Sequence, residues 1–330
     1  MPVPIESLPS VPPGLIEAAA KSTLVPFVGA GISQLAGCPR WADFADYALD
    51  SLTKQGKLSA AQRSQLGGLS PRVKLSVAKL TARRAGVQID YRSILQKPSW
   101  SDDNEGRRAY GHLGELSNRF VTTNYDEWLD IVVPPPERTL STGIEPGRTK
   151  ADTKRVKLHS PEEMTAANFA PNTVVHLHGA LDEPANMVLS TRDYIKRYAN
   201  DGSTGDQENP VLRFLEYLFS QKTILFVGYG LEELEILEYV IQKAKHNSGA
   251  SEGITSHYLL QGFFSFEEAL CDSLHEYFLH ECGIELIPFR RDENNWGQLI
   301  DVLAHFASAL PSSRAEVAQD LAEMEALING

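Results

Sequence analysis

The stretch VPFVGAGIS at residues 25–33 decides the fold expected for this chain. Residues 24–28 are apolar and predict a short buried strand, and Gly29 and Gly31 then allow a tight turn and a close approach of the backbone to a ligand. A strand, a glycine turn and a helix start favour an anion, because free N–H groups and the helix dipole point toward it. The third glycine of the dinucleotide fingerprint is missing, since Gln34 follows the stretch. A plain strand-to-helix turn therefore stays open as the alternative.

Three other apolar segments end in residues of a similar kind. The segments are 119–123, which is followed by Asn124, Tyr125 and Asp126; 173–178, which ends in His178 and is followed by Gly179; and 223–227, which is followed by Gly228, Tyr229 and Gly230. The carboxyl ends of parallel strands meet at one edge of an open α/β sheet, where such folds bind ligands. Four strands that end in this way predict one crevice at that edge.

Strands and helices alternate along the chain, which predicts an α/β fold with a doubly wound, mostly parallel, Rossmann-like sheet and a helical subdomain. Two further strand and helix pairs, at 257–280 and 284–310, complete the pattern. We expect a lead-in with a short helix at 1–21, one catalytic domain at 22–310, and a tail helix at 311–330. Within the catalytic domain we expect the helical subdomain at 41–118 and a polar surface insertion with a basic cluster at 134–172.

Composition excludes several classes of protein. The net charge of −12 disfavours a general nucleic-acid or membrane-surface binder. Cys38, Cys271 and Cys282 are too few and too scattered for a Cys-x-x-Cys zinc module or a disulfide framework, so we expect no metal site. The N-terminus lacks the basic region and apolar core of a signal peptide, and no run approaches ~18 apolar residues. We therefore expect a cytoplasmic protein.

Taken in chain order, the motifs resemble those of the sirtuin-like NAD-consuming proteins, over roughly residues 22–310. GAGIS at 29–33 is similar to the family's cofactor turn, and TTNYD at 122–126 to its Thr-Gln-Asn-Ile-Asp segment. HLHG at 176–179 is similar to the segment that carries its catalytic histidine, and GYGL at 228–231 falls where the family has a second cofactor loop. The resemblance implies that NAD is the substrate.

Two departures separate the chain from the deacylase members of the family. Those carry two Cys-x-x-Cys pairs that bind zinc, and their Ile-Pro-Asp-Phe-Arg loop stands where this chain has CPRW at 38–41. The pattern is more similar to the bacterial branch that hydrolyses NAD as the toxic effector of anti-phage defence systems. The resemblance therefore implies no zinc, a homo-oligomer, and a defence partner such as a HerA-type ATPase or a short Argonaute-like sensor.

Breaking the bond between nicotinamide and ribose requires a group that positions a nucleophile and a group that takes a proton. We expect Asn124 to hold the attacking water and the ribose hydroxyls, and His178, with a pKa near neutrality, to act as general base. Asp126 would hold the nicotinamide carboxamide or orient its loop. The other cofactor-binding candidates are Gly29, Ala30, Gly31, Ile32 and Ser33 around the pyrophosphate, Arg40 over it, and Gly228, Tyr229 and Gly230 in the second loop.

Structural roles stay open for several of these residues. Asn124 could cap the helix that follows it, His178 could be a core histidine, Asp126 a structural acceptor, and Arg40 a solvated side chain. The function expected is an NAD glycohydrolase that yields nicotinamide and ADP-ribose and has low basal activity. The alternatives are an NAD-dependent protein deacylase and a non-catalytic subunit that senses NAD or ADP-ribose.

Overall fold

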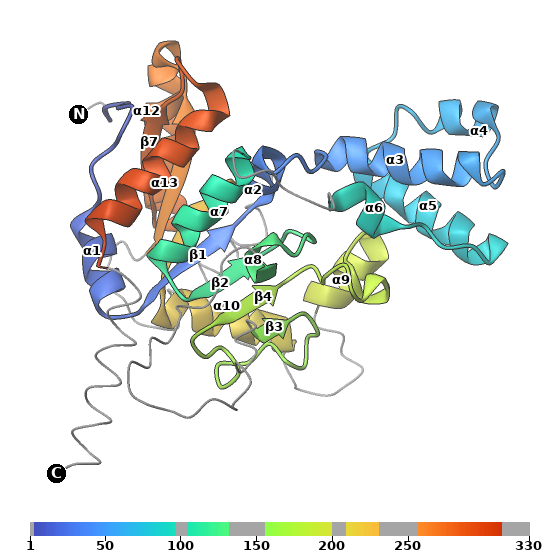
Figure 1. Cartoon of the computed structure of the whole chain (residues 1–330), viewed down its shortest axis with the longest axis horizontal. Helices are drawn as coiled ribbons and strands as arrows, with labels where there is room; N and C mark the ends of the chain where they lie inside the picture. The colour runs from blue at the N-terminus through green and yellow to red at the C-terminus, as the bar shows by residue number, and fades with distance from the viewer. Residues whose placement is uncertain (1–2, 97–103, 132–155, 200–208, 231–256, 312–330) are drawn as a thin grey trace, which may run out of the picture.

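A seven-stranded parallel sheet forms the centre of the molecule (Figure 1). The computed structural model describes residues 3–96, 104–131, 156–199, 209–230 and 257–311. The strand order is β3-β4-β2-β1-β5-β6-β7. Strands β2 to β4 lie on one side of β1, with β4 between β2 and the edge strand β3, and β5 to β7 follow in chain order on the other side. This confirms the predicted doubly wound Rossmann-like fold. The strands are β1 Leu24–Val28, β2 Arg119–Thr122, β3 Val156–Leu158, β4 Thr173–His176, β5 Thr223–Val227, β6 His257–Phe263 and β7 Ile284–Arg290.

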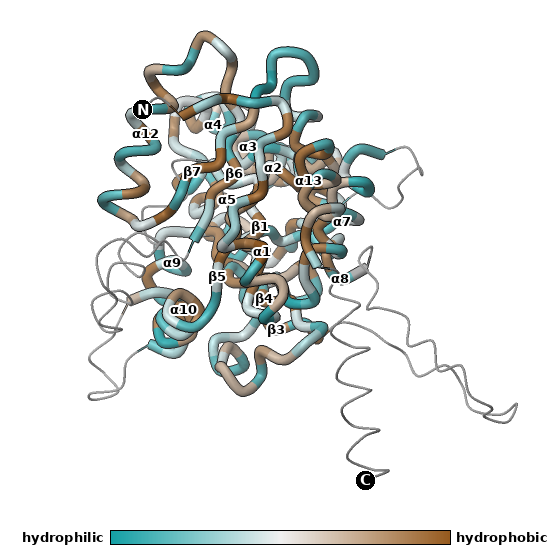
Figure 2. The backbone as a smooth tube through the Cα atoms, turned by 90° about the vertical axis from the view of Figure 1, so that its left-hand side faces the viewer, coloured by the Kyte–Doolittle hydropathy of each residue, from teal (hydrophilic) through white to brown (hydrophobic). Residues whose placement is uncertain are grey.

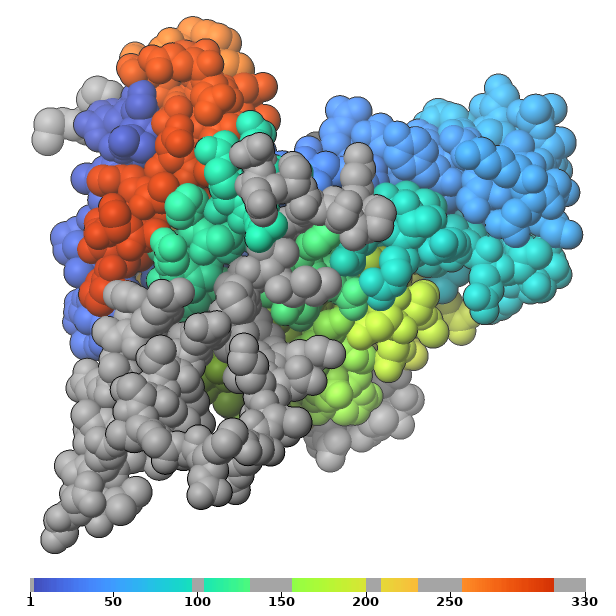
Figure 3. Space-filling model, viewed as in Figure 1, coloured from blue at the N-terminus to red at the C-terminus, as the bar shows by residue number. Residues whose placement is uncertain are grey.

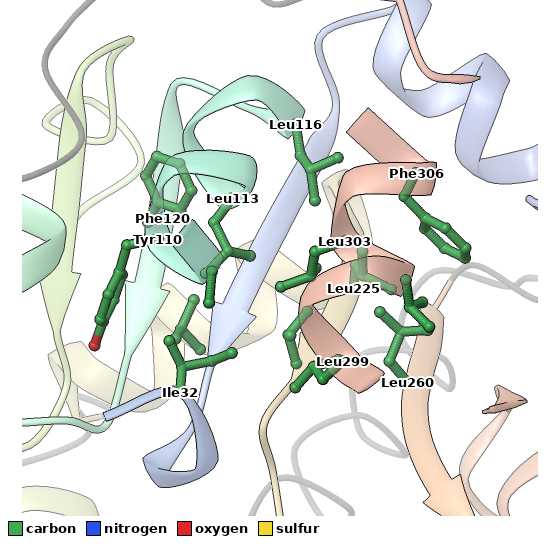
Figure 4. Packing of buried hydrophobic residues seen from close by; sticks show 14 of the residues in the cluster. Ile32, Tyr110, Leu113, Leu116, Phe120, Leu225, Leu260, Leu299, Leu303 and Phe306 are labelled. Carbon is green, nitrogen blue, oxygen red and sulfur yellow. The ribbon is translucent and has the colours of Figure 1, made fainter. Parts of the chain in front are cut away.

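Helices cover both faces of the sheet, because residues in each strand alternate between two cores. In β1, Leu24 and Val28 face the core under α7 and α13, while Val25 and Phe27 face the core under α10. Figure 4 shows the first core, where leucines of α7 and α13 pack together with Phe306 of α13 and Leu225 of β5. The helices of the first face are α1 Pro13–Ala20, α2 Ala30–Leu35, α7 Glu105–Leu116, α8 Trp128–Ile131 and α13 Gln298–Ala309, and those of the second are α10 Pro210–Gln221 and α12 Glu268–Tyr277, followed by the π-helical turn η5 Phe278–Cys282.

A third core lies beyond the carboxyl end of the sheet. It packs the buried faces of α3 and α5 around Phe44 and Leu75, and this helical lobe projects from the rest of the molecule (Figure 3). The last helix expected in this lobe, α7, packs instead on the sheet against α2 and α13. The lobe therefore ends near Leu95 rather than at residue 118. Its helices are α3 Trp41–Lys54, α4 Ala60–Gln65, α5 Pro71–Ala85 and α6 Tyr91–Leu95, and α9 Thr191–Tyr198 lies against α5.

The described part of the expected insertion, from residue 156, is not a loose surface segment. β3 extends the sheet beside β4, and Met164 and Phe169 are buried under the second face. Lys157, expected in a basic cluster, forms ion pairs with Glu127 (2.5 Å) and Asp182 (3.0 Å). Lys157 is therefore half-buried and paired, unlike a side chain of a polar surface insertion. The other residues of the expected basic cluster, Lys150, Lys154 and Arg155, lie outside the described residues, as does the expected tail helix.

Short elements complete the chain. Residues before α1 run beside the edge strand β7, where Glu6 forms a parallel bridge with Phe289. Hydrophobic segments of the tube concentrate in the centre of the molecule and hydrophilic ones on its outside (Figure 2). In the part of the chain that the structure describes, no helix is long and apolar enough to cross a membrane. The 3-10 turns are η1 Pro184–Asn186, η4 Ser265–Glu267 and η6 Asn295–Gly297.

Candidate functional site

A cavity of about 620 Å³ lies at the carboxyl ends of β1, β2 and β4, between the sheet and the helical lobe. This is the edge at which the strand-end motifs predict a crevice. Ala30, Asn124 and His178 reach the cavity from three neighbouring strands, and α3, α5 and α9 provide its other walls. The lining residues are Ala30, Ser33, Cys38, Pro39, Trp41, Phe44, Ser70, Pro71, Arg72, Leu95, Thr123, Asn124, Tyr125, Asp126, Leu177, His178, Val188, Leu189, Ser190, Tyr194 and Tyr198.

The two glycine turns pack against each other at the ends of β1 and β5. A Cβ on Gly29 would lie 2.6 Å from the Gly228 carbonyl oxygen, and one on Gly31 would lie 2.9 Å from the same atom. Gly228 itself has a φ of +69°, a conformation that side chains disfavour. The Gly31 N–H donates to the Gly228 carbonyl oxygen at 2.8 Å, so this amide is used within the protein. The glycines therefore allow the two turns to approach each other closely, whereas the sequence predicts that they allow a ligand to approach the backbone.

The remaining residues of the two turns divide between the cavity and the core. Ala30 and Ser33 line the cavity, whereas Ile32 is fully buried in the first core. Tyr229 packs its ring against Phe27 and shares a hydrogen bond of 3.0 Å with the Thr123 hydroxyl. Among the described residues, the lining of the cavity does not include Gly29, Gly31, Gly228, Tyr229 or Gly230.

Asn124 joins the end of β2 to the turn after β1. Its Nδ2 donates to the Gly29 carbonyl oxygen at 2.9 Å, and its backbone N–H donates to the Thr122 hydroxyl at 3.0 Å. These bonds hold the side-chain amide at the wall of the cavity. The helix-capping alternative does not describe Asn124, because it is Asp126 that accepts the Trp128 N–H at the start of α8, at 3.3 Å.

Asp126 is held by protein donors on both carboxylate oxygens. Ser33 donates to Oδ2 at 2.5 Å, and Tyr110 donates to Oδ1 at 3.0 Å. Burial raises the pKa of Asp126, although these donors oppose the shift. The geometry favours the role of orienting the loop over that of binding a ligand through a free carboxylate.

His178 lies on the wall of the cavity among three tyrosine rings. The ring centroids of Tyr125, Tyr194 and Tyr198 are 6.3, 5.9 and 6.0 Å from its own. Burial, followed by repulsion from Arg197 and Arg72, lowers the pKa of His178 to about 3. The expected pKa near neutrality is therefore wrong for this form of the protein. His178 is a neutral imidazole throughout the physiological range, and a weak base.

His176 is a buried support for Asn124. Its Nδ1 lies 3.1 Å from the Asn124 carbonyl oxygen, and its Nε2 lies 3.0 Å from Oδ2 of Asp130. Burial alone would lower the pKa of His176, but the Asp130 carboxylate outweighs it and raises the pKa. An imidazole that bridges two acceptors in this way fixes the peptide that carries Asn124.

The structure does not bring Arg40 to the cavity. Its side chain is 71% exposed and pairs with Asp43 at 2.8 Å, at the start of α3. The neighbouring Pro39 and Trp41 line the cavity instead. The loop is therefore in the expected place, and the side chain expected to cover the ligand points away.

No sequence motif indicates the walls that α5 and α9 contribute to the cavity. Arg72 comes from a helical stretch without any motif, and its guanidinium carbon lies 4.6 Å from the centroid of the Tyr194 ring. Tyr194 and Tyr198 are four residues apart on α9 and therefore share a helix face, a spacing that is visible in the sequence. For Arg72 the sequence offers no such signal.

Comparison with known families matches a model of the SIR2-like domain to residues 118–287. The matched span contains Asn124, His178 and the second glycine turn, and the first turn lies before it. A search of curated proteins finds no match. Within the described residues, no group of three or more His, Cys, Asp or Glu side chains is arranged to hold a metal ion.

Proposed function

Because this chain belongs to the SIR2-like family, whose members use NAD, we propose that it hydrolyses the bond between nicotinamide and ribose. The observation that carries the proposal is the convergence of Asn124 and His178 on one cavity, beside the turn that follows β1. These are the two residues that the chemistry requires, and they come from neighbouring strands β2 and β4. A cavity of about 620 Å³ with polar groups on one wall suits a small-molecule substrate.

The residues divide the work of the reaction. The bond between C1′ of the ribose and the nicotinamide nitrogen breaks, and its electron pair leaves with nicotinamide. The oxygen of a water molecule bonds to C1′, and one proton is released. Asn124 positions the water and the ribose hydroxyls without a change of charge, and the neutral imidazole of His178 accepts the proton.

The low basicity of His178 supports low basal activity. At a pKa of about 3, the imidazole is a poor acceptor for a proton from water. A negative charge brought near His178 on activation would raise its pKa and with it the rate. We therefore also propose the role that the resemblance implies, a cytoplasmic effector of a bacterial anti-phage system. In that role the chain assembles with copies of itself and with a HerA-type ATPase or an Argonaute-like sensor.

The same pKa favours a second candidate function. A subunit that binds NAD or ADP-ribose and does not turn it over needs the cavity but not a strong base. Calorimetry with NAD separates the two functions, because a sensor binds the dinucleotide and releases no nicotinamide in any assembly.

The test is nicotinamide release from NAD by the full chain, alone and with the product of a neighbouring gene. Asn124→Ala removes a positioned polar group and is expected to lower the rate by about 10²- to 10³-fold. Asn168→Ala is the matched control, because Asn168 is exposed and its side chain donates to the Glu163 carbonyl oxygen, outside the cavity. Equal rates for Asn124→Ala and the wild type, or no release in any assembly, would sink the proposal.

A further inference from the structure

One end of the cavity carries positive charge. Arg72, in the first turn of α5, lines the cavity and lies over the face of Tyr194, 4.6 Å from the ring centroid. Tyr194 in turn lies edge-on to His178. α5 and α9 pack against each other, so the arginine and the tyrosine approach from two helices that are far apart in the sequence (Figure 1).

A second arginine lies behind this wall. Arg197 is only 5% exposed, and its guanidinium donates to two backbone carbonyl oxygens, of Asn186 at 2.9 Å and of His159 at 3.3 Å. Burial lowers the pKa of Arg197. A buried cation whose hydrogen-bond acceptors are all neutral is costly, because no ion pair offsets the loss of its hydration.

The carboxylates of this region do not supply the balance. Asp193 is paired with Lys79 at 2.8 Å, and Glu162 and Asp193 act on Arg197 only from beyond ion-pair distance. Asp126, the one acidic residue of the lining, is engaged by Ser33 and Tyr110. Among the residues that the structure describes, neither Arg72 nor Arg197 has a carboxylate within ion-pair distance.

The charged end is separate from the glycine turn. Neighbouring strands lie about 4.8 Å apart, and the order β4-β2-β1 places Asn124 between His178 and the turn after β1. Arg72 and Tyr194 line the cavity on the same side as His178, which is the side away from the glycine turn.

We propose that the end of the cavity between Arg72, Tyr194 and His178 is a subsite for a phosphate group. A guanidinium binds phosphate oxygens through two parallel N–H bonds, and Arg72, which is exposed to solvent, is free to offer them. The buried charge of Arg197 behind the wall adds to the attraction of an anion. The phosphate belongs either to the dinucleotide itself or to a second phosphorylated ligand. The subsite does not require that NAD is cleaved.

Occupancy of this subsite has a consequence for His178. The groups that face its ring are three neutral tyrosines and two cations, Arg72 and Arg197. A phosphate bound to Arg72 cancels part of their repulsion and raises the proton affinity of the imidazole. If the proposed hydrolysis holds, phosphate binding thereby makes His178 a better base.

The first experiment measures binding of inorganic pyrophosphate to the full chain by calorimetry and by histidine NMR. We expect the wild type to bind pyrophosphate, and the His178 resonance then to titrate with a higher pKa than in the free protein. Arg72→Gln should bind pyrophosphate at least 10-fold more weakly. Arg72→Lys should recover part of the affinity, because lysine restores the positive charge but not the two parallel N–H donors of the guanidinium. The matched control is Arg84→Gln, an exposed arginine in the last turn of the same helix. The proposal is overturned if wild type does not bind pyrophosphate or if Arg72→Gln binds it equally well.

The second experiment identifies the source of the phosphate by the kinetics of nicotinamide release. A 10-fold rise of KM for NAD in Arg72→Gln supports the subsite and assigns the phosphate to NAD. An unchanged KM, with loss of the response of the rate to added pyrophosphate, supports it and assigns the phosphate to a second ligand. An unchanged KM together with an unchanged pyrophosphate response counts against it. A chain without turnover contradicts the proposed hydrolysis, and the binding experiment then decides the subsite alone.

Discussion

The two ends of the cavity differ in how their polar groups are satisfied. At the end formed by β1 and β2, Asn124 bonds to Gly29 and Asp126 bonds to Ser33 and Tyr110. At the other end, Arg72 lies on a tyrosine ring and no described carboxylate neutralises it. The first end is pre-organised by hydrogen bonds within the protein, whereas the arginine of the second end is exposed to solvent and has no ion-pair partner among the described residues. On the proposed phosphate subsite, the position of Asn124 is fixed before binding, whereas the basicity of His178 changes on binding.

The largest effect on stability is expected at the pre-organised end. Gly29→Ala places a Cβ 2.6 Å from the Gly228 carbonyl oxygen and 2.6 Å from the Tyr229 ring. Backbone at this point cannot move cheaply, so we expect a loss of about 3 kcal/mol in the free energy of unfolding. Urea denaturation measures it.

The control for this substitution is Gly111→Ala in α7, where a Cβ would meet nothing within 4 Å. It is expected to stabilise the helix by about 0.5 to 1 kcal/mol. Equal stabilities of Gly29→Ala and wild type would show that the turns are not closely packed.

His178 and His176 are expected to change the free energy of unfolding with pH in opposite directions. The folded pKa of His178, about 3, is below its unfolded value, so the unfolded chain binds a proton first as pH falls. This costs about 2 kcal/mol of stability at pH 5 relative to pH 8, at 1.36 kcal/mol per unit. The pKa of His176 is raised, so its contribution is fully present below the unfolded pKa and is lost as pH rises through the folded pKa.

Chemical denaturation across pH 4 to 8 measures both contributions. His178→Gln should remove the loss on the acid side, because the variant has no group there to protonate. His176→Gln should remove the loss on the alkaline side. If the acid slope of His178→Gln matches that of wild type, the ligand-free site does not depress the pKa of this histidine.

The smallest effect is expected at the mouth of the cavity. Arg40→Ala removes an ion pair with Asp43 that is exposed to solvent, and water screens such pairs so that they contribute little to stability. We also expect KM for NAD to stay within twofold of wild type, in contrast to Arg72→Gln. A large rise of KM for Arg40→Ala would place its side chain over the bound ligand after all.

The order of elements and the edge that holds the site could be predicted from the sequence. Apolar runs of strand length, each broken by glycine or a polar residue, identified β1, β2, β4 and β5. β3 was missed because three residues with a lysine at the centre carry too weak a signal. The lobe boundary was missed because α7 has the same helical periodicity as α3 and α5, and periodicity does not say which surface a helix covers.

The sequence alone determined that Asn124 and His178 lie at one edge of a parallel sheet, since the carboxyl ends of parallel strands coincide. Only the tertiary structure decided that Asp126 is engaged by Ser33 and Tyr110, that the Arg40 side chain is exposed, and that Arg72 lines the same cavity as His178. The physical reason is that hydrogen bonding, burial and the field at a titrating group depend on neighbours from distant segments. The local sequence determines where a strand ends, whereas the pKa of His178 depends on its burial and on the cations of α5 and α9.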